Sequence, residues 1–180
     1  VLMSFLNDPY QPAELEYGLT RKAIQILHAT GHTFVTLTKG GTRALRDIKL
    51  FTPRDEFAST LTTTTDELSR KWEPGAALFE DRCNALRTFH EAGIPTWVSL
   101  EPVLYEDEVY KIVEKTRNFV NHYRIGRLNR NAHEKTINWY GFAERVTKFM
   151  LENDIPYFIK KELLPYLPEG VPDVYRCRRP

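Results

Sequence analysis

Polar side chains end almost every apolar run that the sequence predicts to be a β-strand. The residues at these ends are Asn7, Asp8, Thr38, Lys39, Thr60, Thr62, Thr63, Ser99, Glu101, Arg127, Asn129 and Lys160. Their carboxylate, ammonium, amide and hydroxyl groups can hold a charged ligand or move a proton. Solvation of loops explains any one of them, but it explains Lys39 and Glu101 less well, because each directly ends an apolar strand. The pattern indicates a site at the strand ends.

The strands that would position these side chains alternate with helical patterns along the whole chain. The predicted strands are residues 1–6, 33–38, 57–62, 95–100, 118–125 and 156–159. Such alternation implies right-handed crossovers and a parallel sheet, either open and doubly wound or part of a barrel. The G-x-G-x-x-G motif of dinucleotide binding is absent after the first strand. In a parallel barrel the carboxyl ends of all strands share one face, where barrel enzymes build their sites.

The first strand and the helix after it carry clear local signals. The stretch from residue 1 to 5 is apolar enough to lie deep in a core. Pro12 and Glu14 then suit a helix N-terminus, and Gly31 supplies its end. One packed helix face is predicted, which consists of Leu15, Leu19, Ala23, Ile26 and Leu27.

The composition predicts one globular domain over residues 1–180. Hydrophobic residues make up 42% of the chain and charged residues 27%. The net charge is +1, so no overall positive field points to nucleic acid. No run approaches the roughly 18 apolar residues of a membrane span, and no secretory signal is present, so a cytoplasmic protein is expected. Cys83 and Cys177 lack the spacing of a zinc site, and Cys83 is expected to be buried on a helix face.

Several stretches together resemble one known family. The sequence from Met3 to about Asn129 is similar, in order, to a radical S-adenosylmethionine (radical SAM) subfamily related to spore photoproduct lyase. The stretches that carry the resemblance are SFLNDPYQPAE, LTRKAIQIL, TLTKGG, STLTTTTDELSRKWEPGAA, FHEAGIPTWVSLEPV and YRIGRLN. Their combination is specific, although each one alone is weak. The similarity fades towards the C-terminus.

The resemblance implies an α/β fold, a partial (β/α)6 TIM-like barrel with parallel strands. In this family a 4Fe-4S cluster chelates the amino and carboxylate groups of S-adenosylmethionine (SAM). One electron, implied to come from a flavodoxin or ferredoxin, cleaves SAM to methionine and a 5′-deoxyadenosyl radical. That radical abstracts hydrogen from a substrate. Cluster and SAM lie at the strand ends, where the polar residues had already placed a site.

The sequence departs from the family at the iron ligands. The family carries three cysteines as C-x3-C-x2-C after its first barrel strand, and nothing like this motif occurs in the chain. The apolar strand at residue 1 matches the family's second strand, which favours a fragment that lacks the first strand and cluster loop. The alternative is a degenerate relative that cannot hold the cluster. On the fragment interpretation the cluster ligands are expected outside this chain, which alone would be inactive.

The resemblance implies roles for the first strand ends. Lys39 matches a lysine that spore photoproduct lyase directs towards the SAM carboxylate, a task that suits a point-charge ammonium. Asn7 matches a position that contacts the SAM amino end, and Asp8 could accept a hydrogen bond from the same ammonium. An Asx turn before Pro9 is nearly as good an explanation for Asp8. Trp72 is expected mainly to pack, with stacking on adenine as the alternative.

Later strand ends receive roles in the same way. Thr60 and Thr62 match small polar residues that usually meet the SAM ribose and carboxylate, and Glu101 would lie near the adenine or substrate. Arg127 and Asn129 are placed to reach the substrate or the SAM carboxylate, although a structural arginine explains Arg127 equally well. No metal ligand and no catalytic residue can be assigned within this chain.

Three functions compete at this point. The first is a radical SAM enzyme with an unknown substrate. The second is a non-catalytic binding module built on a degenerate barrel, and the third is a hydrolase that uses Asp8 and Glu101 as its carboxylate pair. The lyase's hydrogen-donor cysteine aligns with Phe5, so photoproduct repair is not expected. Nucleic acid remains a partner by kinship only, because no basic-aromatic pattern supports it.

Overall fold

The strands of the chain form one sheet whose order in space is their order in sequence. The computed structural model describes residues 1–3 and 7–177. The strands are β1 (Leu2–Met3), β2 (Val35–Thr38), β3 (Glu56–Thr60), β4 (Thr96–Val103), β5 (His122–Arg127), β6 (Tyr157–Ile159) and β7 (Val174–Tyr175). β1 to β6 are parallel, and β7 pairs antiparallel with β6. The sheet is open, so the predicted partial barrel of parallel strands is confirmed.

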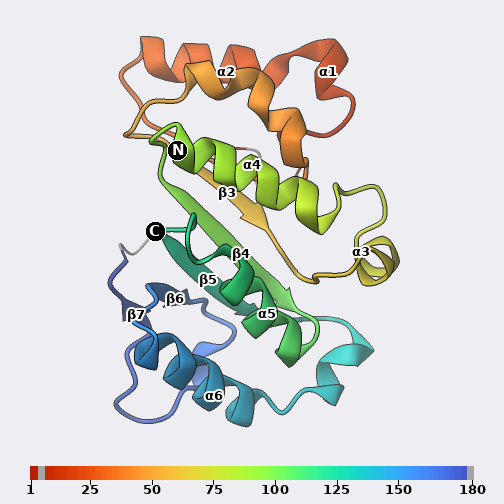
Figure 1. Cartoon of the computed structure of the whole chain (residues 1–180), viewed down its shortest axis with the longest axis vertical. Coiled ribbons are helices and arrows are strands. Elements are labelled where there is room, and N and C mark those ends of the chain that lie inside the picture. The colour runs from red at the N-terminus through yellow and green to blue at the C-terminus, as the bar shows by residue number, and fades with distance from the viewer. Residues whose placement is uncertain (4–6, 178–180) are drawn as a thin grey trace.

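Helices fill the connections between the strands (Figure 1). They are α1 (Glu14–Tyr17), α2 (Leu19–Ala29), α3 (Asp66–Trp72), α4 (Phe79–Glu91), α5 (Glu106–Thr116) and α6 (Trp139–Glu152). Three further helices are of the 3-10 type: η1 (Gly41–Leu50), η2 (Ala132–Thr136) and η3 (Leu164–Tyr166). Within the described ranges, no helix is long and apolar enough to cross a membrane.

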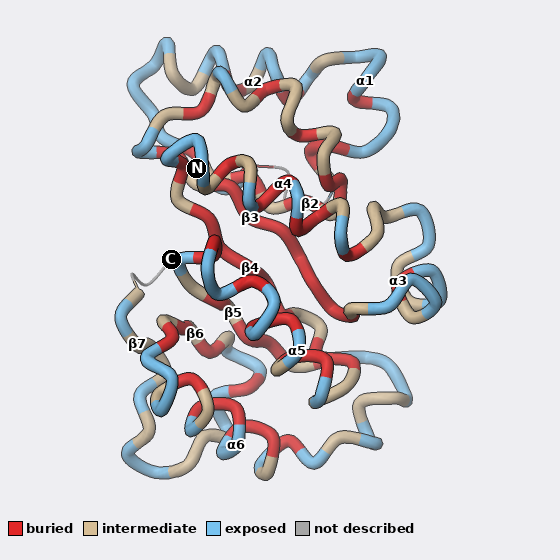
Figure 2. Tube along the Cα trace, in the orientation of Figure 1, coloured by how far each residue is buried: buried red, intermediate tan, exposed pale blue. Residues whose placement is uncertain are grey.

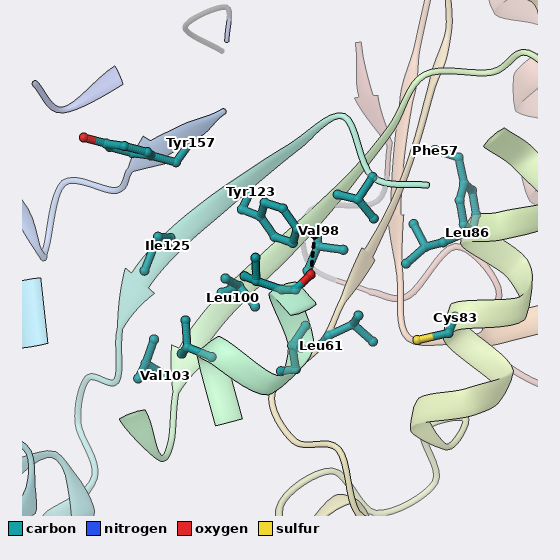
Figure 3. Packing of buried hydrophobic residues seen from close by; sticks show 14 of the residues in the cluster. Phe57, Leu61, Cys83, Leu86, Val98, Leu100, Val103, Tyr123, Ile125 and Tyr157 are labelled. Carbon is teal, nitrogen blue, oxygen red and sulfur yellow. Dashed lines mark hydrogen bonds between the residues drawn. The ribbon is translucent and has the colours of Figure 1, made fainter. Parts of the chain in front are cut away.

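The two faces of the sheet differ in what covers them. Residues that pair across parallel strands share a face, so Ala58, Trp97 and His122 lie on one side of the sheet. Their chain neighbours, such as Val98 and Tyr123, lie on the other side and belong to the buried core beneath the helices. Figure 3 shows this apolar packing between the strands and helix α4. The first face, here called the inner face, is the concave side on which the cavities lie.

The first strand is shorter and less buried than predicted. Met3 is buried, but Val1 and Leu2 are exposed, so the prediction of a deep core strand is wrong for these two residues. The reason is that β1 lies at the edge of the sheet and pairs only with β2. Phe5, the residue aligned with the lyase cysteine, lies outside the described residues.

The predicted first helix is two helices. Gly18, with φ of +62°, ends α1 in the left-handed region and turns the chain into α2. This break separates Leu15 from the apolar residues of α2, and within α2 Ala23 and Leu27 pack against the core. Leu15, Leu19 and Ile26 are exposed, whereas Ile24 is fully buried. Figure 2 shows much of α1 and the outer side of α2 as exposed.

Some elements escaped prediction because their signals are short. α3, η2 and the two-residue strand β7 are absent from the predicted order. β5 begins at His122 rather than at residue 118, and β4 continues through Val103. Elements of one or two turns, or of two residues, carry too little periodicity to be recognised in sequence.

A buried carboxylate fixes the entrance to β2 and β3. Asp55 accepts hydrogen bonds from the backbone N–H of Phe34 (3.1 Å), the backbone N–H of Thr52 (2.8 Å) and the Thr52 hydroxyl (2.7 Å). The Nε2 atom of His28, at the end of α2, lies 3.0 Å from the same carboxylate. Burial alone would raise the pKa of Asp55, but these hydrogen bonds outweigh it and the pKa is lowered. Asp55 therefore joins helix, turn and strand while ionised.

We expect Asp55→Asn to lower the free energy of unfolding by about 2 kcal/mol at neutral pH, because an amide N–H₂ replaces an oxygen that accepts charge-assisted bonds. The folded pKa lies below the unfolded value of about 3.9, so this stabilisation is present above that pH and disappears as the pH falls further. Urea unfolding measures both effects. Glu152→Gln, which alters an exposed pair with Lys148, is the control and should change stability by less than about 0.5 kcal/mol. Equal losses in the two variants would contradict the role of Asp55.

Candidate functional site

A cavity of about 600 Å³ opens on the inner face at the carboxyl ends of the strands. Asn7, Asp8, Lys39, Thr60 and Glu101 all line it. These residues come from four separate strand ends and were the sequence's candidates for a site. Because parallel strands end at one edge of the sheet, the fold brings these side chains to a single hollow.

The Asp8 carboxylate joins the ends of β1 and β2. One oxygen accepts from the backbone N–H of Tyr10 (2.8 Å) and from the Thr38 hydroxyl (2.6 Å). The other accepts from the backbone N–H of Lys39 at 2.6 Å. The contact to Tyr10 is the Asx turn that the sequence allowed. Asp8 thus shapes the rim of the cavity, and both of its oxygens are engaged.

Lys39 reaches a buried ion pair beside the cavity. Its Nζ atom lies 2.9 Å from Glu73, and the second Glu73 oxygen lies 2.7 Å from the guanidinium of Arg82. The Arg82 side chain is 2% exposed and that of Lys39 is 39% exposed, so one end of this chain of charges is buried and the other is accessible. Burial would raise the pKa of Glu73, but Arg82 and then Lys39 outweigh it and lower the pKa. Glu73 therefore holds Lys39 as a carboxylate.

Glu101 is also paired. Its side chain forms an ion pair with Lys160, whose Nζ atom also lies 3.3 Å from the Ser99 hydroxyl. Glu101 lies against Gly126 on β5, where a Cβ atom would stand 2.6 Å from the Glu101 Oε1 atom. Glycine at position 126 is therefore required by the close approach of the Glu101 side chain.

The remaining lining residues differ in exposure. Asn7 is exposed at the mouth, and Thr60 is 6% exposed at the end of β3. The backbone carbonyl of Thr60 accepts a hydrogen bond from Arg82 at 2.8 Å. The same buried arginine therefore supports both the strand end that carries Thr60 and the carboxylate that holds Lys39.

Three candidates from the sequence do not line the cavity. Thr62 is buried just beyond the end of β3, and its hydroxyl has no hydrogen-bond partner in the described residues. Arg127 lies 3.4 Å from Glu134 and stacks over the ring of Trp139 on the helix-covered side of β5. Asn129 is exposed in the loop, where its amide donates to the Arg127 carbonyl. The roles assigned to these three residues receive no support from the position of the cavity.

The sequence reasoning missed Arg124 and Trp97 as site residues, yet both line the cavity. The signal that could have found them is strand alternation. Tyr123 and Ile125 are buried on the helix side, so Arg124 between them must point to the inner face. By the same rule Arg127 points outward with Ile125, which explains why it is absent from the cavity.

Aromatic side chains from α3, from η2 and from the residue before α5 pack together outside the cavity lining. The Trp72 ring lies 5.0 Å from His133, and the Trp72 Nε1 atom donates to the Tyr105 hydroxyl at 3.3 Å. The His133 ring lies 5.0 Å from Tyr105. Trp72 thus has the packing role that the sequence favoured.

The described residues contain no group of three or more cysteines, histidines and carboxylates arranged to hold a metal ion. Cys83 lies on the buried face of α4, where burial raises the pKa of its thiol to about 12. Cys177 lies near β7, and its sulfur is 3.0 Å from the Tyr157 carbonyl. These two thiols cannot supply the ligands of an iron–sulfur cluster.

Sequence comparison finds a relative of this chain but no family model. The sequence matches no protein-family model. It is 30% identical over 135 residues to the uncharacterized protein MJ0683 of Methanocaldococcus jannaschii, an alignment that covers 73% of this chain and 51% of that protein. The chain therefore spans about half the length of this curated relative.

Solved structures with the same fold come from Streptococcus suis. The SuiB structure bound to S-adenosylmethionine superposes with a TM-score of 0.67 at 11% identity, over 91% of this chain and 40% of that chain. Another crystal structure of SuiB gives a TM-score of 0.69 at 11% identity with the same coverage. SuiB bound to precursor peptide SuiA gives 0.64 at 10% identity, over 89% and 38%. At this level of identity the likeness establishes the fold.

The pKa of His122, which lies on the inner face, is strongly lowered. Burial first, and the nearby Arg124 second, lower its pKa to about 4. In the unfolded chain the pKa of His122 would be about 6.5. Between about pH 6.5 and pH 4 the imidazole is therefore protonated in the unfolded chain and neutral in the folded chain. The free energy of unfolding should therefore fall as the pH is lowered through this window.

We expect His122→Gln to abolish part of this loss, on the order of 1–2 kcal/mol near pH 5. Urea unfolding at about pH 7 and about pH 5 measures it, and an NMR titration of His122 should give a midpoint near 4. The exposed His32 is the control, since His32→Gln should follow the wild type at both values. A His122 midpoint near 6.5 would show that the inner face does not disfavour the imidazolium.

Proposed function

We propose that this chain is the SAM-binding part of a radical SAM-type enzyme, with SAM in the cavity at the strand ends. One observation carries the proposal: five of the residues that the resemblance assigns to SAM line a single cavity, although they lie as far apart as positions 7 and 101. The likeness in fold to SuiB, which has been solved with S-adenosylmethionine bound, supports it.

The cavity suits SAM in size and in charge. Its volume of about 600 Å³ lies within the range of roughly 300–1,000 Å³ of small-molecule sites. Lys39 is accessible and already pairs with a carboxylate, that of Glu73. A second carboxylate, from the methionine part of SAM, would find the same ammonium. Asn7 at the mouth offers an amide oxygen to the SAM amino group, and Thr60 offers a hydroxyl to the ribose.

Glu73 has a positioning role in this proposal. Arg82 keeps Glu73 ionised, and Glu73 in turn holds the Lys39 side chain at the rim instead of leaving it free in solvent. Preorganisation of this kind reduces the conformational entropy that binding must overcome. Glu101, paired with Lys160, would form the wall on the adenine or substrate side.

The 4Fe-4S cluster does not fit the residues present. The two thiols are separated and no metal-binding group occurs in the part of the chain that the structure describes. Our proposal therefore places the cluster ligands outside this chain, with a flavodoxin or ferredoxin as electron donor for the complete enzyme. On this view the chain alone binds SAM but does not cleave it, and the substrate is not defined by the SAM site.

A hydrolase based on Asp8 and Glu101 is disfavoured by their surroundings. Both Asp8 oxygens accept hydrogen bonds from Tyr10, Thr38 and Lys39. Glu101 is held in an ion pair with Lys160. A general acid or base must exchange a proton with the substrate, and these contacts favour a structural role for both carboxylates.

The full-length product, purified without oxygen, should contain iron and acid-labile sulfide in equal amounts. Chemical analysis of both elements, before and after reconstitution, measures this. The absence of iron and sulfide after reconstitution would instead identify a non-catalytic binding module with the same fold.

Lys39→Ala should weaken SAM binding by roughly 10- to 100-fold in the reconstituted full-length protein. A charge-assisted hydrogen bond is worth about 1.5–3 kcal/mol, and about 1.4 kcal/mol corresponds to a factor of ten. Isothermal titration with SAM gives both affinities. Iron content should be unchanged, because Lys39 is not an iron ligand.

The matched control is Lys148→Ala, which removes an exposed lysine from α6. Its SAM affinity should equal that of the wild type. If Lys39→Ala also binds SAM as tightly as the wild type, Lys39 does not hold the carboxylate.

A further inference from the structure

The inner face of the sheet continues beyond the proposed SAM cavity. A second cavity, of about 890 Å³, lies at the amino ends of the strands, and both termini of the described chain contribute to its wall through Val1, Arg176 and Cys177. Trp97 and Arg124 line both cavities. These two side chains therefore stand where one hollow passes into the other.

Arg124 is a half-buried cation without a counter-ion. Its guanidinium lies 3.9 Å from the centre of the Trp97 ring, and its nearest polar contact is the Nε2 atom of His122 at 3.4 Å. It forms no ion pair within residues 1–3 and 7–177. A charge that is withdrawn from water is costly unless it is paired, and burial accordingly lowers the pKa of Arg124.

Trp97 offers a second unused donor at the same place. The residue is 2% exposed, and its indole N–H has no hydrogen-bond partner in the described structure. Buried N–H groups are nearly always hydrogen-bonded in folded proteins. A guanidinium without an ion pair and an indole N–H without an acceptor lie together on the inner face, and the group that would satisfy both is an anion.

The other cations around the two cavities are paired or exposed. Lys39 pairs with Glu73 and is the residue proposed for the SAM carboxylate, Lys160 pairs with Glu101, and Arg176 pairs with Asp154. Arg54 and Lys161 also line the cavities but are exposed to solvent. His122 has a pKa of about 4, so it is neutral near pH 7. Arg124 differs from these cations because it lines both cavities, is half-buried, and has no ion pair among the described residues.

One carboxylate would repel an anion in the second cavity, which lies at the amino ends of the strands. Glu56 lines that cavity, and its Oε2 atom is buried and has no partner in the described residues. The Glu56 charge acts on Arg124 from a distance, because it partly offsets the lowering of the Arg124 pKa that burial causes. Glu56 lines the second cavity and not the first, so the anionic group of a ligand would meet Arg124 from the side of the first cavity.

We propose that Arg124 and the indole N–H of Trp97 bind the anionic group, a carboxylate or a phosphate, of the substrate. This inference rests on the proposed function, because it assumes that the molecule on the inner face is the one that reacts beside SAM. It adds the class of substrate, which is a molecule that carries an anionic group and extends along the inner face from the SAM cavity towards the amino ends of the strands.

Arg87 gives a matched control for the loss of a stacked arginine. Its guanidinium lies 4.7 Å from the centre of the Phe119 ring, and it is exposed on α4, away from both cavities. Arg87→Gln and Arg124→Gln remove the same charge and the same kind of ring contact. Only Arg124→Gln removes a donor from the inner face.

Inorganic phosphate and acetate are the two probes. Each is titrated into the full-length protein while the indole N–H resonance of Trp97, assigned through Trp97→Phe, is followed by NMR. We expect a saturable shift with at least one probe, and the probe that saturates at lower concentration identifies phosphate or carboxylate. Arg124→Gln should weaken binding at least tenfold, Arg87→Gln should leave it unchanged, and Glu56→Gln should tighten it because a repulsive charge is removed.

SAM titrations on the same variants separate this inference from the proposed function. Arg124→Gln should keep the SAM affinity of the wild type, and Lys39→Ala should keep the affinity for the anion probe. An anion site without SAM binding would overturn the proposed function and leave the anion site standing. No saturable shift with either probe, or equal probe affinity in Arg124→Gln and Arg87→Gln, would overturn the anion site.

Discussion

Side chains of a β-strand alternate between two faces, and in this sheet helices cover only one of them. That constraint sorts the residues of every strand. On β5, Tyr123 and Ile125 are buried against the helices, and Arg124 between them lies on the concave side. The inner face can therefore carry charged and aromatic groups at no cost to the core. The cavities lie on the inner face because the helices of the described chain cover the other face of the sheet.

The charges of the site depend on residues outside the sheet. Arg82 belongs to α4 and Glu73 to the connection before it, yet together they fix the accessible Lys39 at the end of β2. Removal of one partner from such a buried pair leaves an uncompensated charge, which is far more costly than the loss of an exposed pair. Arg82 also donates to the carbonyl of Thr60. The helix layer thus orders two strand ends of the cavity at once.

The likeness to SuiB and the sequence resemblance support the same fold by independent routes. The superposition compares backbones at 11% identity and owes nothing to the motifs. The resemblance rests on short stretches such as TLTKGG, which contains Lys39, and on no coordinates. Neither one defines the substrate. The unpaired Arg124 and the unsatisfied Trp97 N–H are properties of this chain, and they give the inner face a chemical preference that the fold alone does not.

The sequence pattern by itself determined the alternation of strands and helices, a parallel sheet, and the gathering of polar strand ends at one edge; the choice of a partial barrel with strands in chain order rested on the family resemblance. These features are local or follow from handedness rules, so periodicity and turn residues were sufficient. Only the tertiary structure decided the ion pairs of the site, in which Glu73 pairs with Lys39 and Lys160 pairs with Glu101. It also placed Arg124 in the cavity and Arg127 outside it. Finally, it left Leu15 and Leu19 exposed. The physical reason is that such contacts depend on strand register and helix rotation, which are set by packing between segments distant in the chain.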